Sequence, residues 1–445
     1  MHESLADEPT ELGLIERREL GFYDPWRTGP TLAVVGGVHG NEPAGILALR
    51  RVLERLHEHR PESFRGRFVG LAGNLAALNH PDRHTRYVEA DLNRLCTPGL
   101  LASDSEGPDL DEARGLTGAL ADERDRARGP FVVLDLHTVS SPSPPFIAMS
   151  DSLRARAVAR HFPLPIFLAF EENLTGLLAD YATTELGAVS MIVEGGQHDD
   201  PCSVEVLEAV VWTALHAAGI LAIGDGPELD TDPREVLARA AGGYARGVFD
   251  IRYRCPIGRD GFAIEPGRRA MDKVRRHRTV IARDEAGPID TPISGRLFMP
   301  NRQPARRVGD DGFFIAVEVG RMWLRLSAWL RRRPLVHRAI PALMPGVRRR
   351  PGREHDLLVA PEIAAVLRRQ IFHLLGYRLI RSTPVEDLSR VRRVWRGVMA
   401  VGGAAWRMAA GFFVGGERGA LPDERPEDWI VARRTLDIRP ENDPG

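Results

Sequence analysis

Two residues near the start of this 445-residue chain have the types and spacing of a metal-binding pair. His39 and Glu42 lie in the segment Gly36–Glu42 (GGVHGNE), directly after the apolar run Thr31–Val35. A spacing of three lets an imidazole and a carboxylate reach one ion from a tight turn, and glycines allow the backbone to bend there. The pair alone is weak evidence, because the same two residue types often lie exposed on a surface.

A second histidine, His137, follows another apolar run, and Asp135 precedes it by two positions. Side chains two residues apart on a strand share a face, so Asp135 and His137 are expected to point the same way. A carboxylate beside a ligating histidine fixes the tautomer of the ring. The alternative is an isolated hydrogen-bonded pair at a strand end. Two imidazoles and one carboxylate leave a fourth position for water, which is typical of catalytic rather than structural zinc sites.

Glu194 ends a third apolar run, Val189–Val193, and two glycines follow it. A carboxylate at such a strand end could act as a general base toward water on a metal, with its pKa tuned by the ion and by burial. The alternative is a structural glutamate in a salt bridge.

The segment Arg86–Arg94 (RYVEADLNR) supplies hydrogen-bond donors. Arg86, Asn93 and Arg94 carry guanidinium and amide groups that suit the recognition of a carboxylate or the polarisation of a carbonyl.

Together these segments resemble the succinylglutamate desuccinylase/aspartoacylase family, a branch of the zinc carboxypeptidase-like fold. The resemblance covers about residues 30–225 and depends on the order and separation of five motifs. These are GGVHGNE, Gly73-Asn74, R-Y-x-x-x-D-L-N-R from Arg86, D-L-H from Asp135, and E-x-G from Glu194.

The resemblance implies a zinc-dependent amidohydrolase that cleaves the linear, non-peptide amide of a small N-acylated, amino-acid-like substrate. It implies one Zn²⁺ per chain on three side chains, those of His39, Glu42 and His137. Glu194 matches the residue that activates the water and later protonates the leaving amine, and Arg86 matches the group that polarises the scissile carbonyl. Asn93 and Arg94 match groups that hold a substrate carboxylate.

Two stretches depart from the family pattern. The aspartate-acyl branch has a further arginine shortly before the catalytic glutamate, whereas Ala182–Gly187 contains none. His198 could contact substrate or lie in a surface loop. The sequence therefore leaves the acyl group and the amine undetermined.

Two other functions remain open, a zinc carboxypeptidase acting on a short peptide and a non-catalytic zinc-binding module. All three expected ligands, His39, Glu42 and His137, are present together with the expected base, Glu194. This argues against a non-catalytic module, because a site that has lost its activity usually lacks its base or one of its ligands. The resemblance also implies a neighbouring β-domain that narrows access to the site, which argues against peptides as substrates.

The elements that must position these residues follow from the apolar pattern. Short apolar runs alternate with helical patterns over residues 30–225, which predicts an α/β fold with a mixed, largely parallel sheet flanked by helices. We expect a zinc-hydrolase catalytic domain over 1–240 and a smaller β-rich domain over 241–320, where short strands are separated by Gly, Pro and Asp turns. Residues 321–445 are expected to form an arginine-rich helical extension, with helices over Trp323–Arg333, Glu362–Leu375 and Val385–Val414.

Charge and motif content limit the kinds of partner that the chain is expected to bind. The net charge is −1 and no nucleic-acid-reading motif is present, so we expect no nucleic-acid partner. The extension could pack on the β-domain or on a second subunit of a homo-oligomer, or lie as a basic helix on an anionic membrane.

Three widely spaced cysteines and a polar, acidic beginning give no sign of a disulfide framework or a secretory signal. No apolar run is long enough to span a bilayer. A cytoplasmic location is therefore expected.

Overall fold

The computed structural model describes residues 13–303, 307–333, 335–336, 347–350, 353–359, 370–380 and 430–434. The described residues up to Val319 form one compact unit, and those from Gly320 to Arg434 form a second.

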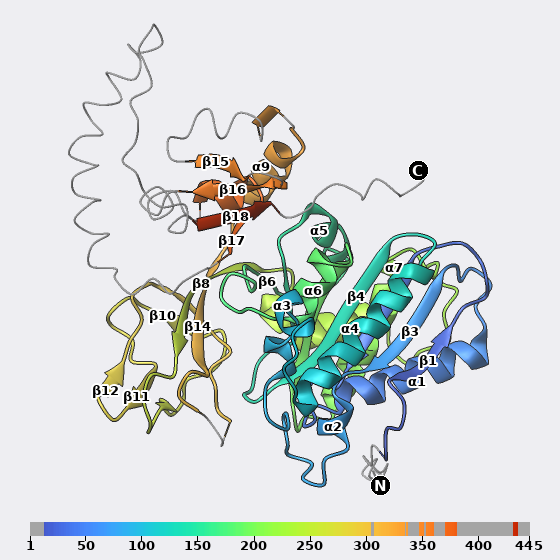
Figure 1. Ribbon diagram of the computed structural model, residues 1–445, viewed down its shortest axis with the longest axis horizontal. Helices are drawn as coiled ribbons and strands as arrows, with labels where there is room; N and C mark the ends of the chain where they lie inside the picture. The colour runs from blue at the N-terminus through green and yellow to red at the C-terminus, as the bar shows by residue number, and fades with distance from the viewer. Residues whose placement is uncertain are drawn as a thin grey trace, which may run out of the picture. The chain divides into compact units, whose positions relative to one another are not determined.

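The first unit is built on an eleven-stranded mixed sheet (Figure 1). Pairing is parallel from β3 through β2 and β4 to β7, and again from β5 through β6 to β8, while the other neighbours are antiparallel. In spatial order the strands are β1 (Glu19–Tyr23), β3 (Arg67–Ala72), β2 (Thr31–Gly36), β4 (Phe131–Val139), β7 (Val189–Gln197), β5 (Phe146–Met149), β6 (Ile166–Leu168), β8 (Val248–Pro256), β14 (Asp311–Glu318), β13 (Gly295–Phe298) and β10 (Lys273–Val274).

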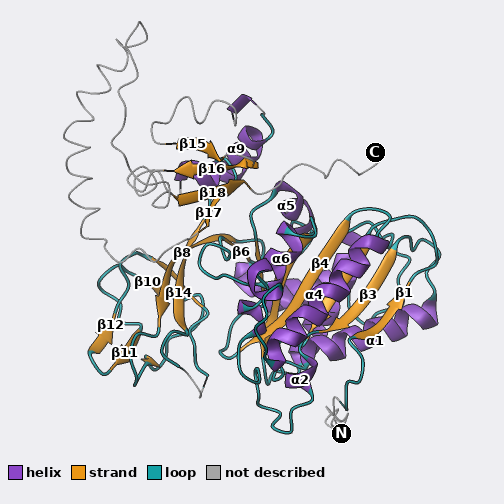
Figure 2. Cartoon of the chain, viewed as in Figure 1, coloured by secondary structure: helices purple, strands orange, loops and turns teal. Residues whose placement is uncertain are grey.

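Helices pack on this sheet, which confirms the expected α/β fold (Figure 2). The strand residues Ala33 and Val35 form one apolar core with Leu116 and Leu120 of α4, because alternate side chains of β2 point to that face. The helices are α1 (Ala44–His59), α2 (Leu75–Leu78), α3 (Pro98–Leu101), α4 (Pro108–Arg126), α5 (Leu153–Ala159), α6 (Leu178–Thr184), α7 (Cys202–Ala217) and α8 (Pro233–Ala241), with short 3-10 turns η1 (Leu92–Arg94) and η2 (Gly242–Tyr244).

The β-rich segment after α8 continues the large sheet. Strand β8 pairs in parallel with β6 and antiparallel with β14, so the strands expected over 241–320 are joined to the preceding elements. A separate three-stranded sheet consists of β12 (Gly287–Ile289), β11 (Ala282–Asp284) and β9 (Ala263–Ile264). The division into domains at 240 and 320 stays a prediction.

The second unit corrects the expectation of an extension made of helices alone. It contains α9 (Arg321–Arg331), where a helix was predicted, and the short α12 (Gln370–Leu374). It also contains an antiparallel sheet in the order β15 (Val347–Arg350), β16 (Arg353–Val359), β18 (Ile430–Arg434) and β17 (Tyr377–Ile380). Leu357 and Val359 are buried and Leu358 is half-buried, an alternation typical of a strand. The helix predicted over Val385–Val414 lies outside the described residues.

Candidate metal centre

His39 and Glu42 are presented by the tight loop between β2 and α1. Gly37 has a φ of 70°, a conformation that favours glycine. A Cβ at Gly40 would lie 2.4 Å from the carbonyl oxygen of Ala77, so a side chain there would collide with backbone. The loop therefore depends on its glycines to bring His39 and Glu42 over the end of the sheet.

His137 and Glu194 come from neighbouring parallel strands. They are register partners of β4 and β7, so their side chains leave the sheet on the same face at the same height. The sequence placed both residues at strand ends, and the strand pairing accounts for their proximity.

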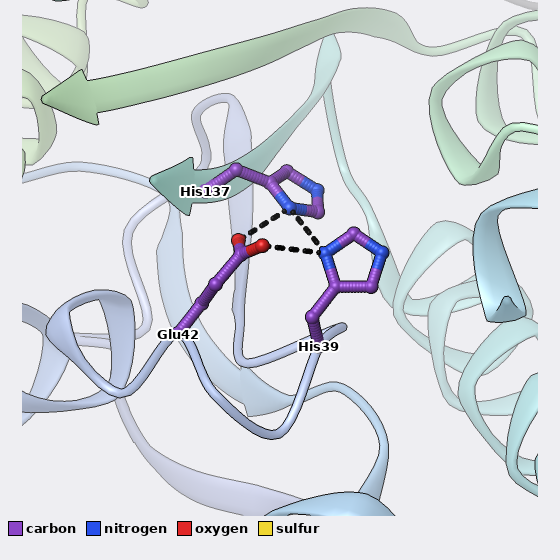
Figure 3. A group of neighbouring side chains, drawn as sticks. All are labelled: His39, Glu42 and His137. Atoms are coloured by element: carbon purple, nitrogen blue, oxygen red, sulfur yellow. Dashed lines mark hydrogen bonds and ion pairs between the residues drawn. The ribbon is translucent and has the colours of Figure 1, made fainter. Parts of the chain in front are cut away.

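The side chains of His39, Glu42 and His137 converge on one point (Figure 3). Glu42 Oε1 lies 2.9 Å from His39 Nδ1, and Glu42 Oε2 lies 3.0 Å from His137 Nδ1. The two Nδ1 atoms are 3.2 Å apart. All three residues are buried, with at most 3% of their surface exposed.

The far side of each imidazole is held by a carboxylate. His39 Nε2 lies 3.1 Å from Asp91 Oδ1, and His137 Nε2 lies 2.9 Å from Asp135 Oδ1. Both rings are therefore oriented with Nδ1 toward the common point. The sequence suggested this role for Asp135, but it did not single out Asp91, although Asp91 belongs to the quoted motif.

These donors fit a divalent cation. Burial works against the charged forms, but His39 and His137 still hold the pKa of Glu42 well below its usual range. Asp135 and Glu42 likewise raise the pKa of His137 against the effect of burial. The raised pKa of His137 favours a positive charge among the surrounding carboxylates, and a bound cation would supply such a charge.

Glu194 lines the same cavity. Burial raises its pKa to about 8, and the positive charges of His137 and Arg86 only partly oppose this. Arg86 donates a hydrogen bond of 2.8 Å to Glu42 Oε1 and lies 3.6 Å from Asp91 Oδ2. The structure therefore brings Arg86 and Glu194 together with the three potential ligands.

Asn93 and Arg94 differ in what they contact. The Asn93 amide nitrogen lies 3.2 Å from both Asp135 Oδ2 and His137 Nε2, and its oxygen accepts a hydrogen bond from the Leu178 amide. Asn93 is thus engaged behind the metal centre, and its contact with a substrate carboxylate stays a prediction.

Arg94 reaches the β-rich segment, where it donates a hydrogen bond of 2.8 Å to Asp311. The same carboxylate accepts a hydrogen bond from Arg254. The sequence did not reveal Arg254 or Asp311 as site residues, because only the pairing of β8 with β14 brings them together.

The cavity around the centre has a volume of about 430 Å³. One wall is apolar and consists of the buried side chains of Phe170, Leu174, Leu177 and Phe314. His198 also lines the cavity, and its Nδ1 lies 2.7 Å from Thr138 Oγ1. The cavity therefore combines a polar end at the metal centre with an apolar side.

Comparisons with known proteins relate the part of the chain that carries this site to amide-cleaving enzymes. Residues 28–211 match the family model of the succinylglutamate desuccinylase/aspartoacylase catalytic domain. Among solved structures, the succinylglutamate desuccinylase of Chromobacterium violaceum has a similar fold. Its TM-score is 0.50 at 17% identity, and the match covers 69% of this chain and 96% of that one.

Two curated relatives are amide-cleaving enzymes by name. An N-acyl-aromatic-L-amino acid amidohydrolase of Xenopus laevis is 32% identical over 113 residues, 25% of this chain and 34% of the relative. An N-alpha-acetyl-L-2,4-diaminobutyric acid deacetylase of Halomonas elongata is 28% identical over 226 residues, 46% of this chain and 60% of the relative. The chain thus matches about a third and three fifths of the lengths of these two relatives.

Proposed function

We propose that the protein is a zinc-dependent deacylase of small N-acyl amino acids, and the match of residues 28–211 to the model of the succinylglutamate desuccinylase/aspartoacylase catalytic domain supports this. The observation that carries the proposal is the convergence of His39, Glu42 and His137 in the cavity that Glu194 also lines. The names of the two curated relatives support the same class of substrate.

We propose that His39, Glu42 and His137 hold the zinc ion. The bound ion supplies Lewis acidity and lowers the pKa of a water molecule toward neutrality. Asp91 and Asp135 fix the two imidazole rings, and Asn93 supports the ring of His137.

Glu194 then accepts a proton from the attacking water and returns it to the amide nitrogen, so that the amine leaves in its neutral form. Arg86 lies close enough to Glu42 and Asp91 to be held at the centre. From there its guanidinium donates to the carbonyl oxygen as negative charge develops on it.

Arg94 is suited to bind the carboxylate of the substrate's amino-acid portion. Its side chain lines the cavity, and its hydrogen bond to Asp311 holds one side of the guanidinium in place. The wall formed by Phe170, Leu174, Leu177 and Phe314 suits an apolar portion of the substrate. A carboxypeptidase that cleaves peptides remains the alternative function. An assay with both N-acetyl amino acids and short peptides distinguishes the two.

The test uses the full chain, loaded with zinc and assayed for amine release from a panel of N-acetyl amino acids and short peptides. We expect about one zinc per chain by elemental analysis and turnover of N-acetyl amino acids. Glu194→Gln should keep the zinc and lose activity by at least about 10²-fold.

Glu185→Gln is the matched control, because Glu185 is an exposed glutamate at the end of α6. Full activity in Glu194→Gln would remove Glu194 from the reaction. Cleavage of peptides in preference to N-acetyl amino acids would support the carboxypeptidase instead, and a zinc-free protein would contradict both.

A further inference from the structure

Helix α9 presents its apolar side chains to solvent and buries polar ones. Met322, Leu326 and Trp329 are 83%, 43% and 55% exposed, whereas Ser327 and Arg331 are 1% and 2% exposed. The three apolar residues are spaced by four and three positions, so they form one stripe along the helix. This is the reverse of the usual orientation of a helix at a protein surface.

The inward face is fixed by contacts within the second unit. The Arg331 guanidinium donates a hydrogen bond of 2.8 Å to the carbonyl oxygen of His373, at the end of α12. A Cβ at Gly376 would lie 2.9 Å from Arg331 Nε, so the guanidinium lies directly against the turn that follows α12. These contacts hold α9 with its apolar stripe outward.

Arginines flank the stripe. Arg321, Arg325 and Arg332 are exposed and, at helical spacing, fall along one side of it. Arg333 lies over the ring of Trp329, 5.2 Å from the ring centroid. No aspartate or glutamate occurs between Glu318 and Glu354, so all charged residues near α9 in the sequence are basic.

We propose that the α9 patch, defined as Met322, Leu326 and Trp329 with Arg321, Arg325 and Arg332, docks on an anionic lipid surface. Insertion of the apolar stripe at the level of the headgroups removes it from water, and the arginines pair with lipid phosphates. Helix α9 has 11 residues, fewer than the roughly 20 that a bilayer-spanning helix needs, so it would lie on the surface.

The charge pattern favours lipid over the other occupants. A second copy of the chain docked through the same patch would bring two sets of arginines together, which costs free energy. A nucleic acid would satisfy the arginines but leave Met322, Leu326 and Trp329 uncovered. An anionic bilayer satisfies both parts of the patch.

The experiment measures sedimentation of the full chain with vesicles of phosphatidylcholine alone and of phosphatidylcholine mixed with phosphatidylglycerol. We expect binding to the anionic vesicles only, and a loss of that binding as salt is raised. Changing Arg321, Arg325 and Arg332 together to Gln should weaken partitioning by about a hundredfold. Changing Met322, Leu326 and Trp329 together to Ser should weaken it by at least about tenfold.

Ile223→Ser is the matched control, because Ile223 is 88% exposed but lies in the first unit, far from α9 in sequence. It should bind as the unchanged chain does. All variants should retain deacylase activity on a soluble substrate, which keeps this test separate from that of the proposed function.

Three results would overturn the proposal. The first is equal binding to neutral and anionic vesicles, or no binding to either. The second is a dimer in solution that the serine changes abolish, which would assign the patch to a second copy of the chain. The third is binding of an oligonucleotide, without vesicle binding, that survives the serine changes. If a variant fails to fold, the proposal is still tested by how vesicle binding of the unchanged chain depends on salt and on anionic lipid.

Discussion

At the scale of single residues, the candidate metal centre depends on carboxylates that lie behind the two histidine rings and do not face the common point. Asp135 is completely buried and holds His137 Nε2, and Asp91 does the same for His39. Such outer carboxylates set the tautomer of each ring and increase its basicity.

Replacing Asp135 by Asn should therefore weaken zinc binding by about 10- to 100-fold, because the amide keeps the size of the side chain but removes its charge. Competition with a chromophoric chelator measures the affinity. Asp311→Asn is the control, since Asp311 lines the same cavity but its carboxylate accepts hydrogen bonds from Arg94 and Arg254 and not from a histidine. Equal zinc affinity in Asp135→Asn and the unchanged chain would refute the role of Asp135.

Glu194 gives a prediction about pH and stability in the metal-free protein. Because burial raises its pKa to about 8, the folded state holds this proton more tightly than the unfolded state, in which a glutamate titrates near its ordinary value of 4.5. The resulting stabilisation is fully present below that value and is lost as the pH rises through about 8.

The unfolding temperature of the metal-free unchanged chain should therefore fall relative to that of Glu194→Gln between acidic and mildly alkaline pH. Thermal unfolding of both proteins across this range measures the difference, and the comparison cancels the other titrating groups. A difference that does not vary with pH would show that Glu194 titrates normally.

At the scale of elements, the sequence predicted β2, β4 and β7, the strands that lead to the candidate site. Each of these strands contains a buried apolar run, and a polar site residue lies at or after its end. The sequence located His137 and Glu194 at strand ends, but their register across β4 and β7 depends on the order of strands in the sheet. Asp91 was overlooked as a partner of His39, since only the folded chain brings η1 to the β2–α1 loop.

Other elements were harder to predict. Helix α4 is rich in charged residues and contains Gly115 and Gly118, so its apolar pattern is weak even though Leu116 and Leu120 pack in the core. Strands β15 and β16 were missed because arginines, Pro351 and Gly352 give that stretch the composition of a loop. In both cases tertiary packing, rather than local preference, determines the element.

At the scale of the whole molecule, the described chain consists of two compact units, and the metal centre belongs to the first. A ligand that binds one folded unit stabilises only that unit unless the two unfold together. Adding zinc to the metal-free protein should raise the temperature of one calorimetric transition and leave a second in place.

His137→Ala is the control, because it removes one of the three proposed ligands. Zinc should then leave the temperatures of both transitions unchanged. A single transition that shifts as a whole would show that the units unfold cooperatively.

The continuation of the sheet from β6 into β8 and β14 has a consequence for how a chain with this fold can diversify. The groups proposed to break the amide all precede residue 200, whereas Arg254, Asp311 and Phe314, which also line the cavity, come from later strands. Substitutions in those strands could remodel which acyl amino acid is accepted and leave the bond-breaking apparatus intact. The cavity lining is thus shared between two stretches of one polypeptide, and the later stretch can change without altering the groups proposed to carry the reaction.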